Sequence, residues 1–308
     1  MRFLFYTDLH LSGMAPRHRV DDYTEALLAK LVETYRIAED RGCDFLVCGG
    51  DFFDFYKVYS YDMIGRAMDV ICQSPLETFL AIGQHDIYGY NPKTFKLSTL
   101  NFVVRNCARL HVMWEPVTIG EVTIYPSHVW DDVRQPPAFS PVKGHCNILV
   151  AHHLLSRRSA PYEVVLTSSL VPSPYDLVLS GDLHSGFETH EIDGTTFCNP
   201  GSLARRTVSE VGRWPQVAVI DVEGNEVSVD IKRLSCPKDG LEVFGETLAE
   251  AARDEARLEL FDASSFVDGV ERFESESVDI FELVLKVGGQ KHLSPEVLNY
   301  ILSKKNEN

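Results

Sequence analysis

The stretch Arg2-Phe3-Leu4-Phe5-Tyr6-Thr7-Asp8-Leu9-His10 contains the unit from which the fold can be predicted. The apolar and aromatic residues at positions 2–6 indicate a short buried β-strand. A carboxylate at Asp8 and an imidazole at His10 follow the end of that strand. The chain repeats this order several times, with a buried strand followed by side chains that can bind a metal ion.

Predicted strands alternate with amphipathic stretches as far as about residue 185. Between the first two strands, Tyr23–Glu39 places apolar residues at the spacing of one helix face. The other elements predicted in this part are strands Phe45–Cys48, Thr78–Ile82, Val122–Tyr125, Asn147–Val150 and Leu177–Leu179, and helices Asp62–Ile71 and Thr94–Val103. Short strands joined by turns such as Asp193-Gly194 follow. This order predicts an α/β fold, a four-layer αββα sandwich of two packed sheets with helices outside.

Five of the predicted strands end in residue types that bind metals. These residues are Asp8 and His10, then Asp51, then Gln84, His85 and Asp86, then His152, and finally Asp182 and His184. In open α/β sheets the carboxyl ends of adjacent strands form one crevice, so we expect these side chains to converge. Carboxylates and imidazoles around a shared carboxylate can hold two divalent ions, an arrangement that supports phosphoester hydrolysis.

The five segments, taken in order, resemble the five motifs of the calcineurin-like metallophosphoesterase superfamily. Asn199-Pro200-Gly201-Ser202 is similar to a further motif of that superfamily. The longer segment Asn-Pro-Gly-Ser-Leu-Ala-Arg, together with the chain length and an acidic C-terminal part, is most similar to the SbcD-like nucleases of double-strand-break processing, phage recombination versions included. The resemblance covers roughly residues 1–232 and implies a catalytic domain over residues 1–235.

The resemblance implies a role for each matching residue. The first metal ion would be held by Asp8, His10, Asp51 and His184, and the second by Asp51, Gln84, His152 and Asp182, with Asp51 bridging the two. His85 would stabilise transition-state charge or protonate the leaving oxygen. Asp86 would orient the ring of His85 and hold its tautomer.

Two positions depart from the family pattern. Gln84 stands where the superfamily usually has Asn, and its longer stem coordinates a metal only if the backbone withdraws slightly. Asp182 stands where the nuclease branch often has His, and a carboxylate favours hard ions, so we expect Mn²⁺, with Mg²⁺ as the alternative. Neighbouring residues of a strand point to opposite faces, so only one of His152 and His153 can face the site, and we favour His152.

Three residues are candidates for substrate contact, each with a simpler alternative. Arg17 follows the first motif, and Arg205 follows the Pro-Gly-Ser segment, so either could bind a phosphate or lie in a solvated loop. Tyr88 could stack on a base beside the metals, although packing against other aromatic residues is the commoner role of an aromatic side chain.

Composition limits the range of functions. The 308 residues include 45 acidic and 29 basic ones, a net charge of −16, which argues against a surface built to grip nucleic acid. Residues 236–308 contain 16 acidic and 8 basic residues and are predicted to form a small acidic α+β cap that binds a partner protein. The seven cysteines contain no CxxC pair and indicate free thiols. With neither a membrane-span pattern nor a signal-peptide pattern, we expect a cytoplasmic protein.

Three hypotheses follow. The first is a metal-dependent DNA nuclease, for which the resemblance implies duplex-end exonuclease and single-strand endonuclease activity, a homodimer and an SbcC-like coiled-coil ATPase partner. The second is a phosphodiesterase or phosphatase that acts on nucleotides or phosphoproteins with the same metal centre. The third is a metal-depleted scaffold, and Gln84 and Asp182 are the only residues that favour it.

Overall fold

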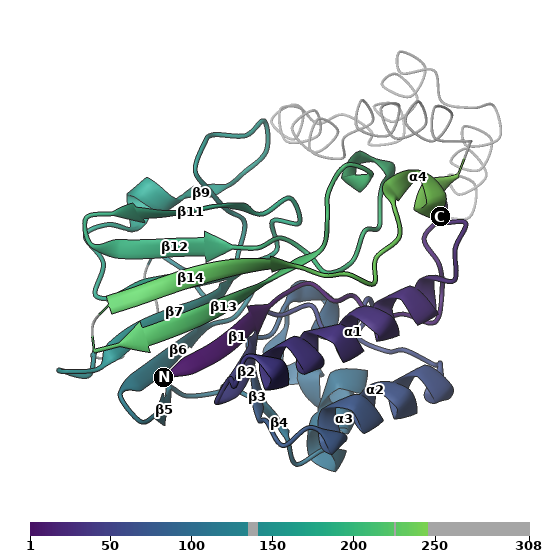
Figure 1. The fold of residues 1–308 in the computed structure, drawn as a ribbon, viewed down its shortest axis with the longest axis horizontal. Coiled ribbons are helices and arrows are strands. Elements are labelled where there is room, and N and C mark those ends of the chain that lie inside the picture. Colours follow the sequence, from purple (N-terminus) through teal and green to yellow (C-terminus); the bar gives the residue numbers. More distant parts are fainter. Residues whose placement is uncertain (135–140, 225, 246–308) are drawn as a thin grey trace, which may run out of the picture. The chain divides into compact units, whose positions relative to one another are not determined.

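The computed structural model describes residues 1–134, 141–224 and 226–245 and contains two six-stranded sheets (Figure 1). The first sheet has the spatial order β14 (Glu226–Arg233), β13 (Gln216–Glu223), β1 (Arg2–Tyr6), β2 (Phe45–Cys48), β3 (Thr78–Leu80) and β4 (Leu110–Val112). The second has the order β11 (Phe187–Ile192), β12 (Thr195–Asn199), β10 (Leu177–Gly181), β7 (Cys146–His152), β6 (Val122–Ser127) and β5 (Val117–Ile119). Both sheets are mixed. In the first, β14, β13 and β1 pair antiparallel and β1 to β4 pair parallel. In the second, β11 and β5 pair antiparallel at the two edges of a parallel centre. The predicted α/β sandwich is therefore confirmed.

Three of the four described α-helices begin where a polar side chain accepts a capping hydrogen bond, whereas Ser60, before the second helix, accepts none. The described helices are α1 (Tyr23–Asp40), α2 (Tyr61–Gln73), α3 (Thr99–Asn106) and α4 (Gly240–Phe244), with 3₁₀ turns at Gln84–Asp86, Pro92–Leu97, Thr167–Leu170 and Val208–Glu210. Asp22 accepts the backbone N–H of Glu25 and starts α1. The helix predicted over Thr94–Val103 is divided, because Ser98 caps α3 and ends the preceding 3₁₀ turn.

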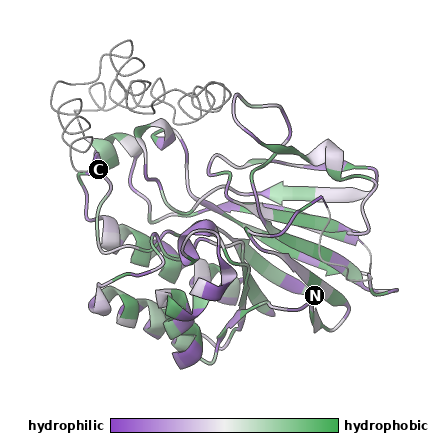
Figure 2. Cartoon of the chain, turned by 180° about the vertical axis from the view of Figure 1, so that it is seen from behind, coloured by the Kyte–Doolittle hydropathy of each residue, from purple (hydrophilic) through white to green (hydrophobic). Residues whose placement is uncertain are grey.

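Alternation along β1 builds two of the apolar layers. Leu4 and Tyr6 point to the side of α1–α3, whereas Phe3 and Phe5 point into the space between the sheets. Figure 2 shows hydrophobic residues concentrated along the strands. Side chains that alternate along the strands thus form the core that holds the two sheets together. The parallel strands of both sheets end at the same edge of the sandwich.

The outer face of the second sheet differs from the prediction. Its apolar side chains, such as Tyr125 and Phe197, pack against Leu155, Leu170 and Tyr175. That covering segment contains the short strands β8 (Leu155–Ser156) and β9 (Val165–Leu166) and a 3₁₀ turn, and none of the described α-helices. Prolines at positions 161, 172 and 174 explain this, because proline disrupts helix interiors. Among the described residues, three of the four predicted layers are present.

The chain continues past the predicted domain boundary onto the same unit. Glu33 of α1 accepts hydrogen bonds from the backbone N–H groups of Ser235 and Cys236, and the N–H of Val20 donates to the carbonyl of Val243 at 3.0 Å. The remainder of the predicted cap, including the strand Val278–Val287 and the helix Pro295–Leu302, lies outside the described residues, so the cap stays a prediction.

One pair of cysteines departs from the expectation of free thiols. Cys72 near the end of α2 and Cys107 after α3 form a disulfide, with their Cα atoms 6.0 Å apart. The prediction was wrong here because spacing along the chain did not show that these two helix ends meet. The other described cysteines are free, and four of them are buried. None of the described helices combines the length and apolar character needed to cross a bilayer.

Truncating the core between the sheets should destabilise the fold. We expect Ile148→Ala, at a fully buried position of β7, to lower the free energy of unfolding by about 2–5 kcal/mol. Ile231→Ala on β14 is the matched control, since Ile231 is 36% exposed and should change stability by roughly 0.5 kcal/mol or less. Urea unfolding measures both values, and equal losses would contradict the proposed position of the core.

Candidate metal centre

The predicted ligands meet where the carboxyl ends of the two sheets adjoin. Asp8 and Asp51 follow β1 and β2 of the first sheet, whereas His152 ends β7 and Asp182 follows β10 of the second. Backbone hydrogen bonds join the loops, since the N–H of His10 donates to the carbonyl of Asp51 at 3.0 Å. The N–H of Asp182 donates to the Asp8 carboxylate at 3.1 Å, which connects the two sheets.

The loops that carry the ligands have an uncommon backbone conformation. Asp8, His10, Asp51 and Asp182 have φ angles of 52°, 46°, 48° and 72°. Non-glycine residues adopt positive φ in only a few per cent of cases, and strained residues gather at functional sites. Gly83 allows the close approach, because a Cβ at this position would collide with the Asp51 carboxylate. The surrounding sheets therefore force these side chains toward one point.

Asp51 lies at the centre of this arrangement. Its Oδ2 atom is 3.4 Å from His152 Nε2, 3.8 Å from His10 Nε2 and 3.9 Å from His85 Nε2. Its Oδ1 atom accepts the backbone N–H of His85 at 2.8 Å. One carboxylate oxygen thus faces three imidazoles, as expected of a ligand shared by two ions.

A first group of ligands surrounds one side of this carboxylate. His10 Nε2 and His184 Nε2 are 3.0 Å apart, and each lies 3.8 Å from Asp8 Oδ1. Asp8, His10 and His184 thus form a cluster that can hold a metal ion. Two imidazole nitrogens and a carboxylate at these separations match the ligands of one divalent ion.

A second group contains Asp8, Asp51 and His152. Asp182 is connected to this group by its N–H bond to Asp8, and Gln84 Nε2 donates to Asp182 Oδ1 at 2.8 Å. This bond leaves Gln84 Oε1 buried without a partner, as are Asp51 Oδ2 and His152 Nε2. Asp51 Oδ2 and His152 Nε2 are 3.4 Å apart. Buried polar atoms rarely lack partners, so these atoms fit a bound cation. These Asp and His clusters are those of a dinuclear metal site.

The outer nitrogen of each imidazole has its own partner. His152 Nδ1 lies 2.7 Å from the carbonyl of Gly49. His10 Nδ1 is 3.3 Å from Asp54 Oδ1, and His184 Nδ1 is 3.4 Å from Glu210 Oε1. Such partners fix the ring orientation and make the inner nitrogen a better ligand. The Nε2 atoms therefore face inward in all three rings.

The predicted role of Asp86 was wrong. Its carboxylate accepts the backbone N–H groups of Gly83, Phe52 and Phe53 at 3.1–3.2 Å and so joins two ligand loops. The ring of His85 is instead held by the carbonyl of Asp54, 2.7 Å from its Nδ1. Burial, together with the Asp51 charge, raises the pKa of Asp86 to about 7 despite those backbone bonds.

The charges of the cluster perturb one another. Burial acts to raise the pKa of Asp51, but the imidazoles of His152 and His10 outweigh it and hold that pKa below its ordinary range. Burial opposes protonation of His152, yet Asp51 raises the pKa of that imidazole well above its usual value. Burial also raises the pKa of Asp182. Divalent cations would favour the ionised carboxylates and the neutral imidazoles, because metal ligands must be deprotonated.

Sequence reasoning missed the roles of Asp54, Arg206 and Glu210. Arg206 Nη2 lies 2.8 Å from Asp54 Oδ1, and the Glu210 carboxylate accepts the backbone N–H of Arg206 at 2.6 Å. A signal existed for Glu210, because Thr207-x-x-Glu210 is a capping-box pattern. That pattern predicts a turn, however, and does not show that a histidine lies beside it.

The predicted substrate contacts are not all near the cluster. Arg205 is only 1% exposed, donates to the carbonyl of Lys238 and lines a pocket that contains none of the predicted metal ligands, so its prediction as a contact for a substrate phosphate at the metal centre was wrong. Tyr88 is 63% exposed and lies against the ring of Tyr56, and Arg17 is exposed, so both stay predictions. His153 contacts Ser127 rather than Asp51.

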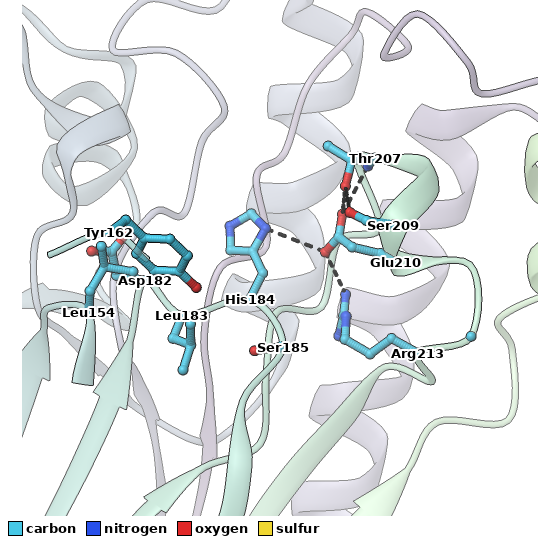
Figure 3. A pocket seen from close by; sticks show the side chains of 11 residues that line it. Leu154, Tyr162, Asp182, Leu183, His184, Ser185, Thr207, Ser209, Glu210 and Arg213 are labelled. Carbon is cyan, nitrogen blue, oxygen red and sulfur yellow. Dashed lines mark hydrogen bonds and ion pairs between the residues drawn. The ribbon is translucent and has the colours of Figure 1, made fainter. Parts of the chain in front are cut away.

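A pocket of about 630 Å³ opens beside His184. Figure 3 shows Tyr162 and Leu154 on one side, Glu210 and Arg213 on the other, and His184 between them. Asp182 also lines this pocket, so a molecule bound there would reach the metal ligands. Its volume suits a small organic group.

The fold and this site together define a metal-dependent phosphoesterase. The family model described as calcineurin-like phosphoesterase matches residues 1–186, more than half of the chain. The chain therefore belongs to the calcineurin-like phosphoesterase family. No curated protein sequence matches the chain.

Among solved structures, a dimetal phosphatase from Danio rerio, LOC 393393, has the same fold. It is 10% identical to this chain with a TM-score of 0.53, covering 76% of this chain and 96% of that chain. Two further structures are similar to this chain. TT1561 of Thermus thermophilus is 12% identical with a TM-score of 0.49, covering 74% of this chain and 97% of that chain. YfcE, a phosphoesterase from E. coli, is 13% identical with a TM-score of 0.39, covering 76% of this chain and 100% of that chain.

Removing the carboxylate that holds His184 should weaken metal binding. We expect Glu210→Gln to lower Mn²⁺ affinity about 10–100-fold, because the charged partner of the imidazole is lost. Glu191→Gln on β11 is the matched control, since Glu191 lies on the strand away from the ligands. Calorimetric titration of the EDTA-treated variants with Mn²⁺ measures the Mn²⁺ affinity of each. Equal affinities in the two variants would show that Glu210 does not support the metal ligand.

Proposed function

We propose that the chain is a two-metal phosphodiesterase or phosphatase that acts on small phosphorylated substrates of nucleotide size. The observation that carries this proposal is the buried Asp51 Oδ2 atom, which faces three imidazoles and accepts no hydrogen bond. The pocket beside His184 supports a small substrate.

Each ion has a set of candidate ligands. Asp8, His10, Asp51 and His184 would hold the first, and Asp51, Gln84, His152 and Asp182 the second. Oxygen-rich ligands favour Mn²⁺ or Mg²⁺. When bound, the ions would polarise the phosphoryl group and lower the pKa of water.

His85 is the candidate general acid. The Asp54 carbonyl holds its Nδ1, which leaves Nε2 on the side of Asp51. The side chain is 27% exposed, so a substrate can reach it, whereas His10 and His152 are fully buried. A protonated His85 would donate from Nε2 to the leaving oxygen.

Charge favours small substrates over duplex DNA. The chain carries a net charge of −16, and the site gathers Asp8, Asp51, Asp54 and Asp182 around one centre. A net negative charge of this size repels a polyanion unless a partner or bound metal offsets it. The likeness to a dimetal phosphatase supports the same proposal at the level of the fold.

A DNA nuclease of the SbcD-like branch is the second candidate. The segment on which that resemblance depends contacts a ligand loop, since Ser202 Oγ donates to the carbonyl of Asp8 at 2.9 Å. The residue after the segment, Arg206, pairs with Asp54. Under this hypothesis DNA is the substrate. The chain would form a homodimer joined to an SbcC-like ATPase, and the ATPase would contribute much of the DNA binding.

One assay separates the two candidates. The purified protein is incubated with Mn²⁺ and either bis(p-nitrophenyl) phosphate or linear duplex DNA, with EDTA as the control. Hydrolysis of the chromogenic diester with intact DNA is the expected result. Degradation of DNA with no hydrolysis of the chromogenic substrate would favour the nuclease, and no activity on either would contradict both.

Loss of His85 should separate chemistry from metal binding. We expect His85→Ala to lower kcat roughly 10²–10⁴-fold, the range for a lost acid–base group, with two Mn²⁺ ions still bound. His111→Ala on β4 is the matched control, because His111 pairs with Glu77 away from the metal ligands. Kinetics and elemental analysis check this, and an unchanged kcat would show that His85 donates no proton.

A further inference from the structure

A second pocket, of about 220 Å³, lies between the start of α1 and the segment that leads into α4. It shares no lining residue with the pocket beside His184. Four basic residues line it: Arg19, Lys30, Arg205 and Lys238. We call it the Arg205 pocket.

Two of these cations are buried with unused donors. Arg205 is 1% exposed, and its Nε and Nη1 atoms have no hydrogen-bond partner. Lys30 is also 1% exposed, and its ammonium group donates one hydrogen bond, to the carbonyl of Leu203 at 2.7 Å. An ammonium group has three donors and a guanidinium five, so both groups can bind a further acceptor.

The acidic residues that line the pocket have partners other than Lys30 and Arg205. Asp21 binds the Arg19 guanidinium through both oxygens, at 2.8 and 2.7 Å. Asp22 caps α1, and Glu25 pairs with Arg66. Within residues 1–134, 141–224 and 226–245, neither Lys30 nor Arg205 forms an ion pair.

Two buried cations without a counter-ion are costly. Burial, reinforced by Arg19 and Arg213, lowers the pKa of Arg205, although Asp21 and Asp239 oppose this. Burial and the neighbouring arginines also hold the pKa of Lys30 well below its ordinary value. An anion between the two groups would restore the balance of charge.

We propose that the Arg205 pocket binds a small tetrahedral oxyanion of the phosphate or sulfate type. The donors come from α1 and from the segment after β12, so an anion whose oxygens point in several directions satisfies them together. The pocket has room for such an anion with several waters, each of which occupies about 30 Å³. This site does not depend on the proposed function.

The bound anion would stabilise the segment beside the metal centre. The N–H groups of Leu203 and Ala204 donate to the carbonyls of Thr7 and Asp8, both at 3.1 Å. Lys30 holds the carbonyl of Leu203 from the other direction. An oxyanion bound to Lys30 and Arg205 would hold the segment around Leu203 and Ala204 in place. The backbone hydrogen bond from Ala204 to Asp8 would then be held in place as well.

Thermal unfolding of the full chain tests the proposal. EDTA-treated protein is titrated with sodium phosphate, with sodium sulfate as a second arm and sodium chloride at equal ionic strength as the control. We expect a saturable rise in Tm, about 2–3 °C at ten times the Kd. The sulfate arm shows whether phosphate alone or any tetrahedral oxyanion is bound. Lys30→Met should abolish the rise, whereas Lys143→Met, at an exposed position, should keep it.

A second measurement uses the unmodified chain, so that the test does not depend on whether the Lys30→Met variant folds. Calorimetric titration of the EDTA-treated chain with sodium phosphate should show saturable binding that chloride at equal ionic strength does not reproduce. No rise in Tm with phosphate or sulfate, an equal rise in the Lys30→Met variant, or no saturable binding heat would overturn the proposal.

Discussion

The metal centre depends on the burial of one shared carboxylate. Asp51 is fully buried, accepts one backbone hydrogen bond through Oδ1 and turns Oδ2 toward three imidazoles. Nearby buried carboxylates such as Asp8 add charge of the same sign, and imidazoles offset only part of it. Divalent cations are the partners that such a cluster requires, because they neutralise several carboxylates at once.

The two packed sheets make this concentration of charge possible. The ligand loops have positive φ angles at Asp8, His10, Asp51 and Asp182, which is unfavourable for each residue. The strands before these loops are held by a core that alternates between the two faces of each sheet, so the loops cannot relax. Asp86 adds to this by joining the loops after β2 and β3 through backbone hydrogen bonds.

Much of the fold and the ligand set could be predicted from the sequence. The strand ends identified Asp8, Asp51 and His152, because buried strands followed by ligand-type residues are a local pattern. The partners of the imidazoles could not be found in this way, since Glu210 lies well beyond His184 along the chain and only tertiary packing brings its turn to that ring.

Side-chain direction explains the remaining errors. Arg205 follows a motif at the site, yet its guanidinium turns into the interior toward Lys238, and no local pattern shows this. The covering of the second sheet was predicted as helical from general architecture, whereas its prolines determine an irregular segment. Pairing of Cys72 with Cys107 likewise depends on tertiary structure, which brings the Cα atoms of these two residues to 6.0 Å from each other.

The most direct test of the account is a crystal structure of the protein grown with Mn²⁺, with anomalous diffraction collected at the manganese absorption edge. The account predicts two anomalous peaks about 3.5–4 Å apart, both within bonding distance of Asp51. One peak would contradict a two-ion centre, and two peaks that do not share Asp51 would contradict its bridging position.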